Sequence, residues 1–134
     1  MRRIVIFLMA FMMVQVAVSG QNSSTIQASS PEFAKIIVEE QGILLDVRTK
    51  REFQNGHIEN AGNLNFYAFD FRKRLLLLAK DKPIYLYCNT GYRSDRAADF
   101  LIRNGYERVY NLRHGIMEWD LYELTICFLK LIPE

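Results

Sequence analysis

A cysteine followed by a short polar loop is the part of this sequence best suited to chemistry. Cys88 comes directly after the apolar and aromatic run 83–87, which predicts a buried strand. Residues 94–103 carry apolar side chains at helical spacing and end at Asn104-Gly105, which predicts a helix. The sequence therefore predicts a cysteine at the end of a strand, joined by a tight loop to a helix N-terminus.

This placement has chemical consequences for Cys88. A helix N-terminus offers unpaired N–H groups and partial positive charge, and both favour a thiolate. We therefore expect a lowered pKa for Cys88 and a nucleophilic role. Gly91 permits a tight loop, and Arg93 adds a guanidinium to an anion pocket. The alternative is that Cys88 is a small apolar residue at the end of a core strand.

The first twenty residues predict a secretory signal peptide. A basic start at Arg2 and Arg3 precedes the apolar run 4–18, and small residues place cleavage after Ser19 or Gly20. A retained membrane anchor is the alternative, but the run is slightly short of the roughly 20 residues that a span needs. We expect an exported protein, with the periplasm as its compartment and no membrane contact after cleavage.

Charge and cysteine content limit the partners of the mature chain. The full sequence has 17 Lys and Arg against 15 Asp and Glu, so the loss of Arg2 and Arg3 leaves balanced charge. No polybasic run remains that would indicate nucleic acid or an anionic membrane surface as a partner. We expect no metal site either. Cys88 and Cys127 could pair in an exported protein, but a cysteine at the base of such a loop is better placed to react.

Strands and helices alternate along the chain. A polar segment, 21–30, is expected to be flexible, and a helix capped by Ser30 follows it. Further expected elements are strands at 43–47, 63–65, 83–87 and 106–112, and helices at 49–56, 66–79, 94–103 and 116–131. This order predicts one α/β domain over 31–134, with a mostly parallel sheet and helices on both faces. Asp46 and Cys88 then lie at the carboxyl ends of strands, where such sheets bind ligands.

Three separated signatures resemble the rhodanese-like (sulfurtransferase) family. The first is Leu45-Asp-Val-Arg48 with Glu52-Phe53, Gly56-His-Ile58 and Ala61-Gly62 behind it. The second runs from Tyr87-Cys88 through Gly91-Tyr-Arg-Ser94. The third comprises Gly105-Tyr106, Val109, Leu112, Gly115 and Trp119. The resemblance covers roughly residues 32–122, and the combination in this order is specific.

The resemblance implies a single rhodanese-like domain that transfers sulfur. Cys88 would take a sulfane sulfur from a small donor such as thiosulfate, hold it as a persulfide, and pass it to a thiol or to cyanide. It implies no cofactor beyond that transient sulfur. Asp46 and Arg48 would support nearby loops as an ion pair. The substrate-binding residues would be Asn89, Thr90, Gly91, Tyr92, Arg93 and Ser94.

Other functions are also compatible with a reactive cysteine in such a loop. Phosphatases of related architecture place five residues between cysteine and arginine, whereas four separate Cys88 from Arg93, which makes a smaller cradle suited to sulfur. Disulfide exchange lacks a Cys-x-x-Cys pair. A non-enzymatic sulfur carrier, or a module that binds a protein partner, is the remaining alternative.

The sequence differs from the family pattern at two places, and each difference leads to a prediction. His114-Gly115 stands where the family usually has two glycines, and we expect it to stiffen or block that turn. The apolar tail from Leu121 to Ile132 is expected to meet a protein partner or to form an adhesive surface.

Overall fold

The computed structural model describes residues 23–130, with side chains described through Glu123. The expected signal peptide, the end of the apolar tail and the side chain of Cys127 lie outside the described residues. The strands are β1 (Ile26–Ala28), β2 (Ile43–Asp46), β3 (Gly62–Asn63), β4 (Ile84–Tyr87) and β5 (Val109–Leu112). The helices are α1 (Ser30–Glu39), α2 (Lys50–Gln54), α3 (Phe71–Leu75), α4 (Tyr92–Arg103) and α5 (Gly115–Lys130).

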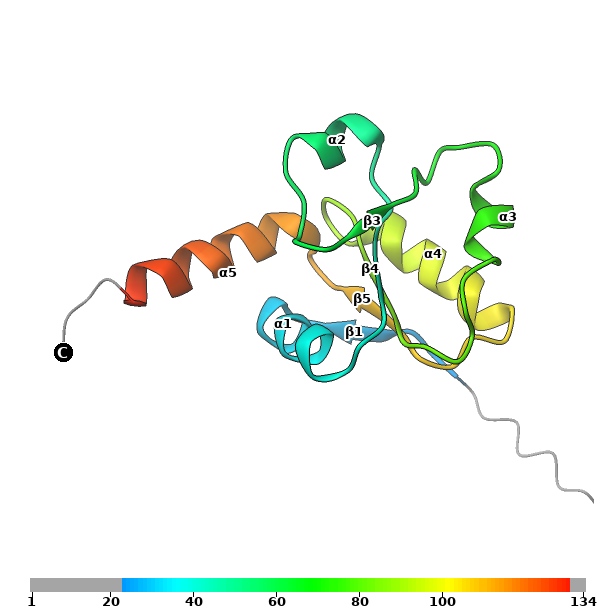
Figure 1. Cartoon of the computed structure of the whole chain (residues 1–134), viewed down its shortest axis with the longest axis horizontal. Helices are drawn as coiled ribbons and strands as arrows, with labels where there is room; N and C mark the ends of the chain where they lie inside the picture. The colour runs from blue at the N-terminus through cyan, green and yellow to red at the C-terminus, as the bar shows by residue number, and fades with distance from the viewer. Residues whose placement is uncertain (1–22, 131–134) are drawn as a thin grey trace, which may run out of the picture.

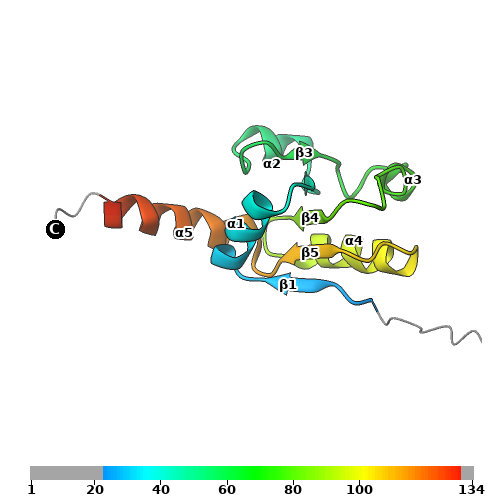
Figure 2. The same cartoon turned by 60° about the horizontal axis from the view of Figure 1, so that its bottom comes forward.

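The five strands form one sheet in the order β1-β5-β4-β2-β3, and all four pairings are parallel. Figure 2 shows β1, β5, β4 and β3 in this order from bottom to top. Asp46 of β2 lies opposite Tyr87 of β4, so the chain leaves both strands at the same carboxyl edge of the sheet. The predicted α/β domain with a parallel sheet is confirmed, and this edge positions Cys88.

Helices cover both faces of the sheet, as predicted. Side chains alternate along β4, so Tyr85 and Tyr87 pack against α1 and α5, while Ile84 and Leu86 pack against α3 and α4. Figure 1 shows α1 and α5 on one side of the sheet and α3 and α4 on the other. Cys88 continues the alternation, and its side chain lies in the cluster beneath α3 and α4. The thiol therefore points toward the N-terminal half of α4.

The segment expected to be flexible, 21–30, is ordered where it meets β5. Ile26–Ala28 form strand β1, and the N–H of Arg113 donates to the carbonyl of Ala28 at 2.9 Å. Ser30 is buried and belongs to α1, which Ser29 caps together with Glu32. The expectations of a flexible segment through Ser30 and of a cap at Ser30 were therefore wrong. The polar composition of residues 21–30 gave no indication of strand β1, which is held by hydrogen bonds to β5.

The helix expected over 66–79 is shorter, since α3 spans only Phe71–Leu75. Asn65 explains the difference, because its side chain accepts from the N–H of Tyr67 and its carbonyl accepts from Ala68, which makes a turn. The edge strand expected at 63–65 is likewise limited to Gly62–Asn63. The polar turn therefore brings Tyr67 to the loop side of the sheet.

Helix α5 begins beside the cysteine loop and then runs away from the sheet in both views (Figures 1 and 2). Within residues 23–130, no helix has the length and apolar character needed to cross a membrane. The first N–H groups of α5 bind the loop, because Ile116 donates to the carbonyl of Cys88 at 2.9 Å and Met117 donates to that of Asn89 at 3.3 Å. The start of α5 therefore fixes the backbone of the cysteine loop.

Two glycines allow the loop after β4 and the turn after β5 to pack closely against each other. Gly115 has φ +68°, and a Cβ there would lie 2.3 Å from the carbonyl oxygen of Asn89. Gly91 has φ +92°, and a Cβ there would lie 1.9 Å from the carbonyl oxygen of Arg113. His114 is exposed, and its φ is not positive, so the turn forms without a second glycine. The expectation that His114-Gly115 blocks this turn was wrong.

Gly115→Ala should destabilise the fold by about 2 kcal/mol or more, because the new Cβ meets both positive φ and the backbone of Asn89. The measurement is urea denaturation followed by circular dichroism. Gly62→Ala is the matched control, since its Cβ would make ordinary contact with Leu45 at 3.6 Å and should cost less than about 1 kcal/mol. Equal losses for the two variants would contradict the close-approach argument.

Candidate active site

Cys88 lies at the carboxyl edge of the sheet as a free and buried thiol, only 1% exposed. The N–H of Gly91 donates to its sulfur at 3.2 Å, and the hydroxyl of Ser94 lies 3.4 Å from the same atom. Gly91 is the last residue before α4, and Ser94 lies in the first turn of that helix. The predicted strand, loop and helix arrangement therefore places hydrogen-bond donors around the sulfur of Cys88.

Two opposing effects act on the pKa of the Cys88 thiol. Burial raises it, because a thiolate is poorly solvated there. Hydrogen bonds from the Ser94 hydroxyl and from the N–H groups of Ser94, Thr90 and Gly91 lower it, and together they outweigh burial. The pKa of Cys88 is therefore lowered, in agreement with the expectation from the helix N-terminus.

The backbone of Gly91 is held in place through its carbonyl group, which keeps its N–H directed at the sulfur of Cys88. Its carbonyl accepts from the N–H of Asp95 at 3.0 Å and from the Asn111 amide at 3.3 Å. The Ser94 hydroxyl lies 3.1 Å from the same carbonyl and shares its single proton between that oxygen and the sulfur of Cys88. Asn111 also donates to the side chain of Gln27 at 2.8 Å. Sequence reasoning missed Asn111 and Gln27. The available signal was a polar residue within the apolar strand around Val109.

Arg93 lies in the first turn of α4 with its side chain only 14% exposed. Its two terminal nitrogens bind Glu52 in a bidentate pair, with NH1 to Oε2 at 3.0 Å and NH2 to Oε1 at 2.7 Å. Its guanidinium carbon also lies 5.7 Å from the centre of the Tyr67 ring. The sequence identified Glu52 as a capping residue of α2, and the structure confirms that cap but adds the pair with Arg93.

This pair shifts both ionisation equilibria. The hydrogen bond from Arg93 is the largest effect on Glu52, and with smaller contributions from Thr49 it lowers the pKa of that carboxyl to about 2. The hydrogen bond to Glu52 is likewise the largest cause of a raised pKa for Arg93, and the charge of Cys88 adds to it. The guanidinium therefore lies within Coulombic range of the sulfur while it is bound to a carboxylate.

Asp46 and Arg48 form the predicted ion pair. Both side chains are buried, and Arg48 donates to Asp46 through Nε at 3.0 Å and through NH2 at 2.7 Å. Arg48 NH2 also donates to the carbonyl of Gly56 at 2.6 Å, which ties the residues that precede α2 to those that follow it. The amide of Asn63 donates to the carbonyls of Asp46 and Arg48. The pair therefore holds the connection that carries Glu52.

The remaining predicted loop residues form the outer surface of the site. Tyr92 and Thr90 are exposed, and the side chain of Asn89 donates to the sulfur of Met117 at 3.5 Å. Thr90 and Tyr92 also line a shallow depression together with Gln27, Gly91, Asp95, Asn111 and Arg113. The structure thus brings residues 89–94 together around Cys88, with Tyr92 and Thr90 available to a partner molecule.

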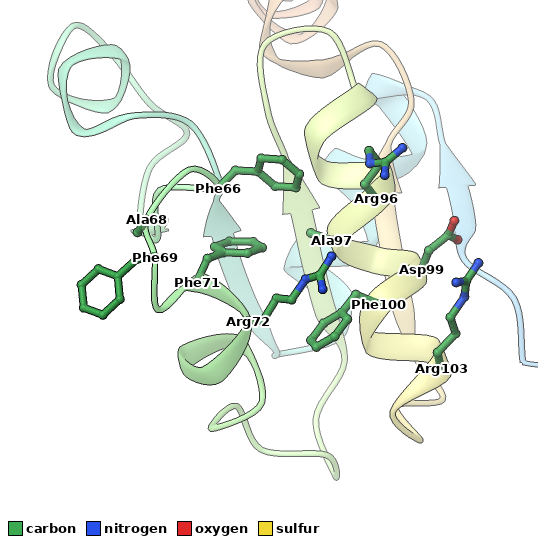
Figure 3. Close-up of a pocket in the computed structure, with 10 residues that line it drawn as sticks. All are labelled: Phe66, Ala68, Phe69, Phe71, Arg72, Arg96, Ala97, Asp99, Phe100 and Arg103. Atoms are coloured by element: carbon green, nitrogen blue, oxygen red, sulfur yellow. The ribbon is translucent and has the colours of Figure 1, made fainter.

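A separate cavity of about 410 Å³ lies between α3 and α4, away from the cysteine loop. Figure 3 shows Phe71 and Arg72 of α3 directed toward Phe100 of α4, whereas Phe69 points away. The guanidinium of Arg72 lies 5.4 Å from the centre of the Phe100 ring. No residue of the loop 88–94 lines this cavity, so it is distinct from the site around the sulfur.

Comparison with known proteins gives matches over most of the described chain. A family model described as Rhodanese-like domain matches residues 29–121. A protein of Bacillus subtilis, named Uncharacterized protein YqhL, is 43% identical over 76 residues, which are 57% of this chain and 59% of that protein. A protein of Allochromatium vinosum, named Sulfurtransferase, is 37% identical over 65% of this chain and 79% of its own length.

Longer relatives and solved structures match the same region. A tRNA uridine(34) hydroxylase of Onion yellows phytoplasma is 35% identical over 70% of this chain, but the match spans only 32% of that protein. The crystal structure of a rhodanese-like domain protein from Staphylococcus aureus superposes with a TM-score of 0.62 and 25% identity, over 71% of this chain and 91% of that one. The chain is therefore similar to whole small proteins and to parts of larger ones.

Ser94→Ala should raise the pKa of Cys88, because the thiolate loses its hydroxyl donor while burial is unchanged. The rate of alkylation by iodoacetamide, measured against pH, follows the thiolate fraction, so the variant should react severalfold more slowly near neutral pH. Thr90→Ala is the control, because it keeps the N–H of that residue. An unchanged pH profile for Ser94→Ala would contradict the assigned role of the hydroxyl.

Proposed function

The chain belongs to the rhodanese-like domain family, and we propose that it is a sulfurtransferase in which Cys88 carries the transferred sulfur as a persulfide. The observation that carries the proposal is the surroundings of the buried thiol, where three backbone N–H groups and a hydroxyl lower its pKa. Similarity to a named sulfurtransferase over 65% of this chain supports the same activity. A module that only binds partners has no need of an activated thiolate.

The proposed first step is attack by the Cys88 thiolate on the sulfane sulfur of a donor. A bond forms between the sulfur of Cys88 and the donor's outer sulfur, and the donor's own bond to that sulfur breaks. The leaving group departs with the electron pair, as sulfite from thiosulfate or as a thiolate from an organic persulfide. Cys88 then carries one added sulfur, and no external oxidant or reductant is required.

The donors around the sulfur of Cys88 fit the needs of this step. N–H groups of Thr90, Gly91 and Ser94 stabilise negative charge on the attacking sulfur, and in the proposed persulfide the same groups would donate to the terminal sulfur. In the second step an acceptor thiolate or cyanide attacks that outer sulfur and regenerates the Cys88 thiolate. Tyr92 and Thr90, which are exposed beside the loop, would meet the acceptor.

We also propose that the protein acts outside the cytoplasm, with the periplasm as its compartment. Support comes from the leader pattern of residues 1–20. Its small donor and its thiol acceptor would then be molecules of that compartment. The apolar sequence beyond Leu121 supports a protein partner as a further component.

Treatment of the reduced protein with excess thiosulfate or an organic persulfide should add one sulfur, about 32 Da, to the peptide that contains Cys88. Intact-protein and peptide mass spectrometry measure this gain. A thiol acceptor added afterwards should remove the added mass, because the persulfide is an intermediate.

Cys88→Ser is the control and should gain no mass. A wild-type protein that gains no sulfur from either kind of donor would contradict the proposal. A gain that neither thiol nor cyanide removes would also contradict the proposal, because oxidation of the thiol to a sulfinic acid adds nearly the same mass and is not reversed by thiols.

A further inference from the structure

We propose that Glu52 is a specificity-determining residue that disfavours dianionic sulfur donors and thereby favours persulfides of thiols. This inference rests on the proposed sulfur transfer at Cys88. The side chain of Glu52 is hydrogen-bonded to Thr49 and Arg93 and not to the sulfur of Cys88, so its effect passes through Arg93, and it is a positioning residue.

The geometry of the pair shows why Arg93 is not free to bind a substrate. Both of its terminal nitrogens donate to the two carboxylate oxygens of Glu52, at 3.0 and 2.7 Å. Bidentate pairing of this kind fixes the plane of the guanidinium as well as its charge. The arginine that a sulfur oxyanion would seek near the loop is therefore already bound to an anion of the protein.

Glu52 is itself held in place by the start of α2. Its Oε2 accepts from the N–H of Thr49 at 2.9 Å and from the Thr49 hydroxyl at 2.7 Å. The connection that carries it is fixed in turn by the buried pair of Asp46 with Arg48. An incoming donor would have to displace an anchored carboxylate, rather than a mobile one, to reach Arg93.

The other charges near the loop do not replace Arg93. Arg48 is bound to Asp46, Arg96 donates to the hydroxyl of Tyr92, and Arg113 is exposed and donates to the carbonyl of Gln27. Charges on the exposed surface are screened by solvent, so they attract a donor only weakly. The donors that face the sulfur closely are thus uncharged N–H groups and a hydroxyl.

This arrangement separates two classes of sulfur donor. Thiosulfate brings two negative charges toward Cys88, and the Arg93 guanidinium that could offset them is already paired with Glu52. An organic persulfide delivers its outer sulfur with at most one charge, and the N–H groups of the loop serve that charge. The protein should therefore load from persulfides of thiols more readily than from thiosulfate.

The test is Glu52→Gln, which removes the carboxylate charge and keeps an oxygen to accept from Thr49, since glutamine also completes a capping box. The initial rate of Cys88 persulfide formation is measured by mass spectrometry against the concentration of thiosulfate and of the persulfide of 2-mercaptoethanol. For thiosulfate, the second-order rate constant of loading should rise about fivefold, mainly through half-saturation at a lower donor concentration, and the gain should shrink at high salt. For the persulfide, the same rate constant should change less than about twofold.

Two further variants make the result specific. Glu40→Gln breaks a second glutamate–arginine pair, with Arg108 at the opposite end of the sheet, and should leave both donors unaffected. The double variant Glu52→Gln with Arg93→Gln should lose the gain with thiosulfate, because the gain requires a freed guanidinium.

The inference is overturned if Glu52→Gln leaves thiosulfate loading unchanged, lowers it, or raises loading from both donors equally. In each of those cases wild-type loading from the persulfide still supports sulfur transfer at Cys88. Failure of the wild type to load from either donor overturns the proposed function and this inference together.

Discussion

The candidate active site depends on the donation of backbone N–H groups to the sulfur of Cys88. These groups point at the sulfur only because the loop closes tightly at Gly91 and because the turn at Gly115 packs against its backbone. The first N–H groups of α5 then bind the carbonyls of Cys88 and Asn89, so that the carbonyls face α5 while Gly91 faces the sulfur. The parallel pairing of β4 with β5 brings the two connections together. A buried sulfur can therefore have a lowered pKa despite the cost of desolvation.

Two ion pairs extend this organisation to the other side of the site. Asp46 with Arg48 fixes the connection that follows β2, and Glu52 with Arg93 joins that connection to the first turn of α4. A buried pair such as the first stabilises position more than it stabilises the fold as a whole. The second pair leaves the sulfur of Cys88 faced by N–H dipoles and a hydroxyl, while the guanidinium of Arg93 is bound to Glu52. This distinguishes the site from an open anion pocket.

Features that depend only on neighbouring residues in the chain could be predicted from the sequence. The apolar run before Cys88, the capping residues Thr49 and Glu52, and the need for glycine at position 91 are all readable from neighbouring residues. Strand β1 was not readable, because its one polar side chain, Gln27, is bound by Asn111 and Asp95 and its backbone pairs with β5, all far away in sequence. The partner of Arg93 was missed for the same reason, since 41 residues separate it from Glu52. A sequence pattern can assign a charged residue to a helix or strand, but it does not show which oppositely charged residue lies beside it in the folded protein.

The most direct test of the central claim is a high-resolution crystal structure of the protein after treatment with an organic persulfide. The account predicts that the added sulfur on Cys88 accepts hydrogen bonds from N–H groups of the loop 89–94, while Arg93 stays bound to Glu52. An added sulfur that points away from these N–H groups, or that is bound by Arg93 after its release from Glu52, would contradict the account.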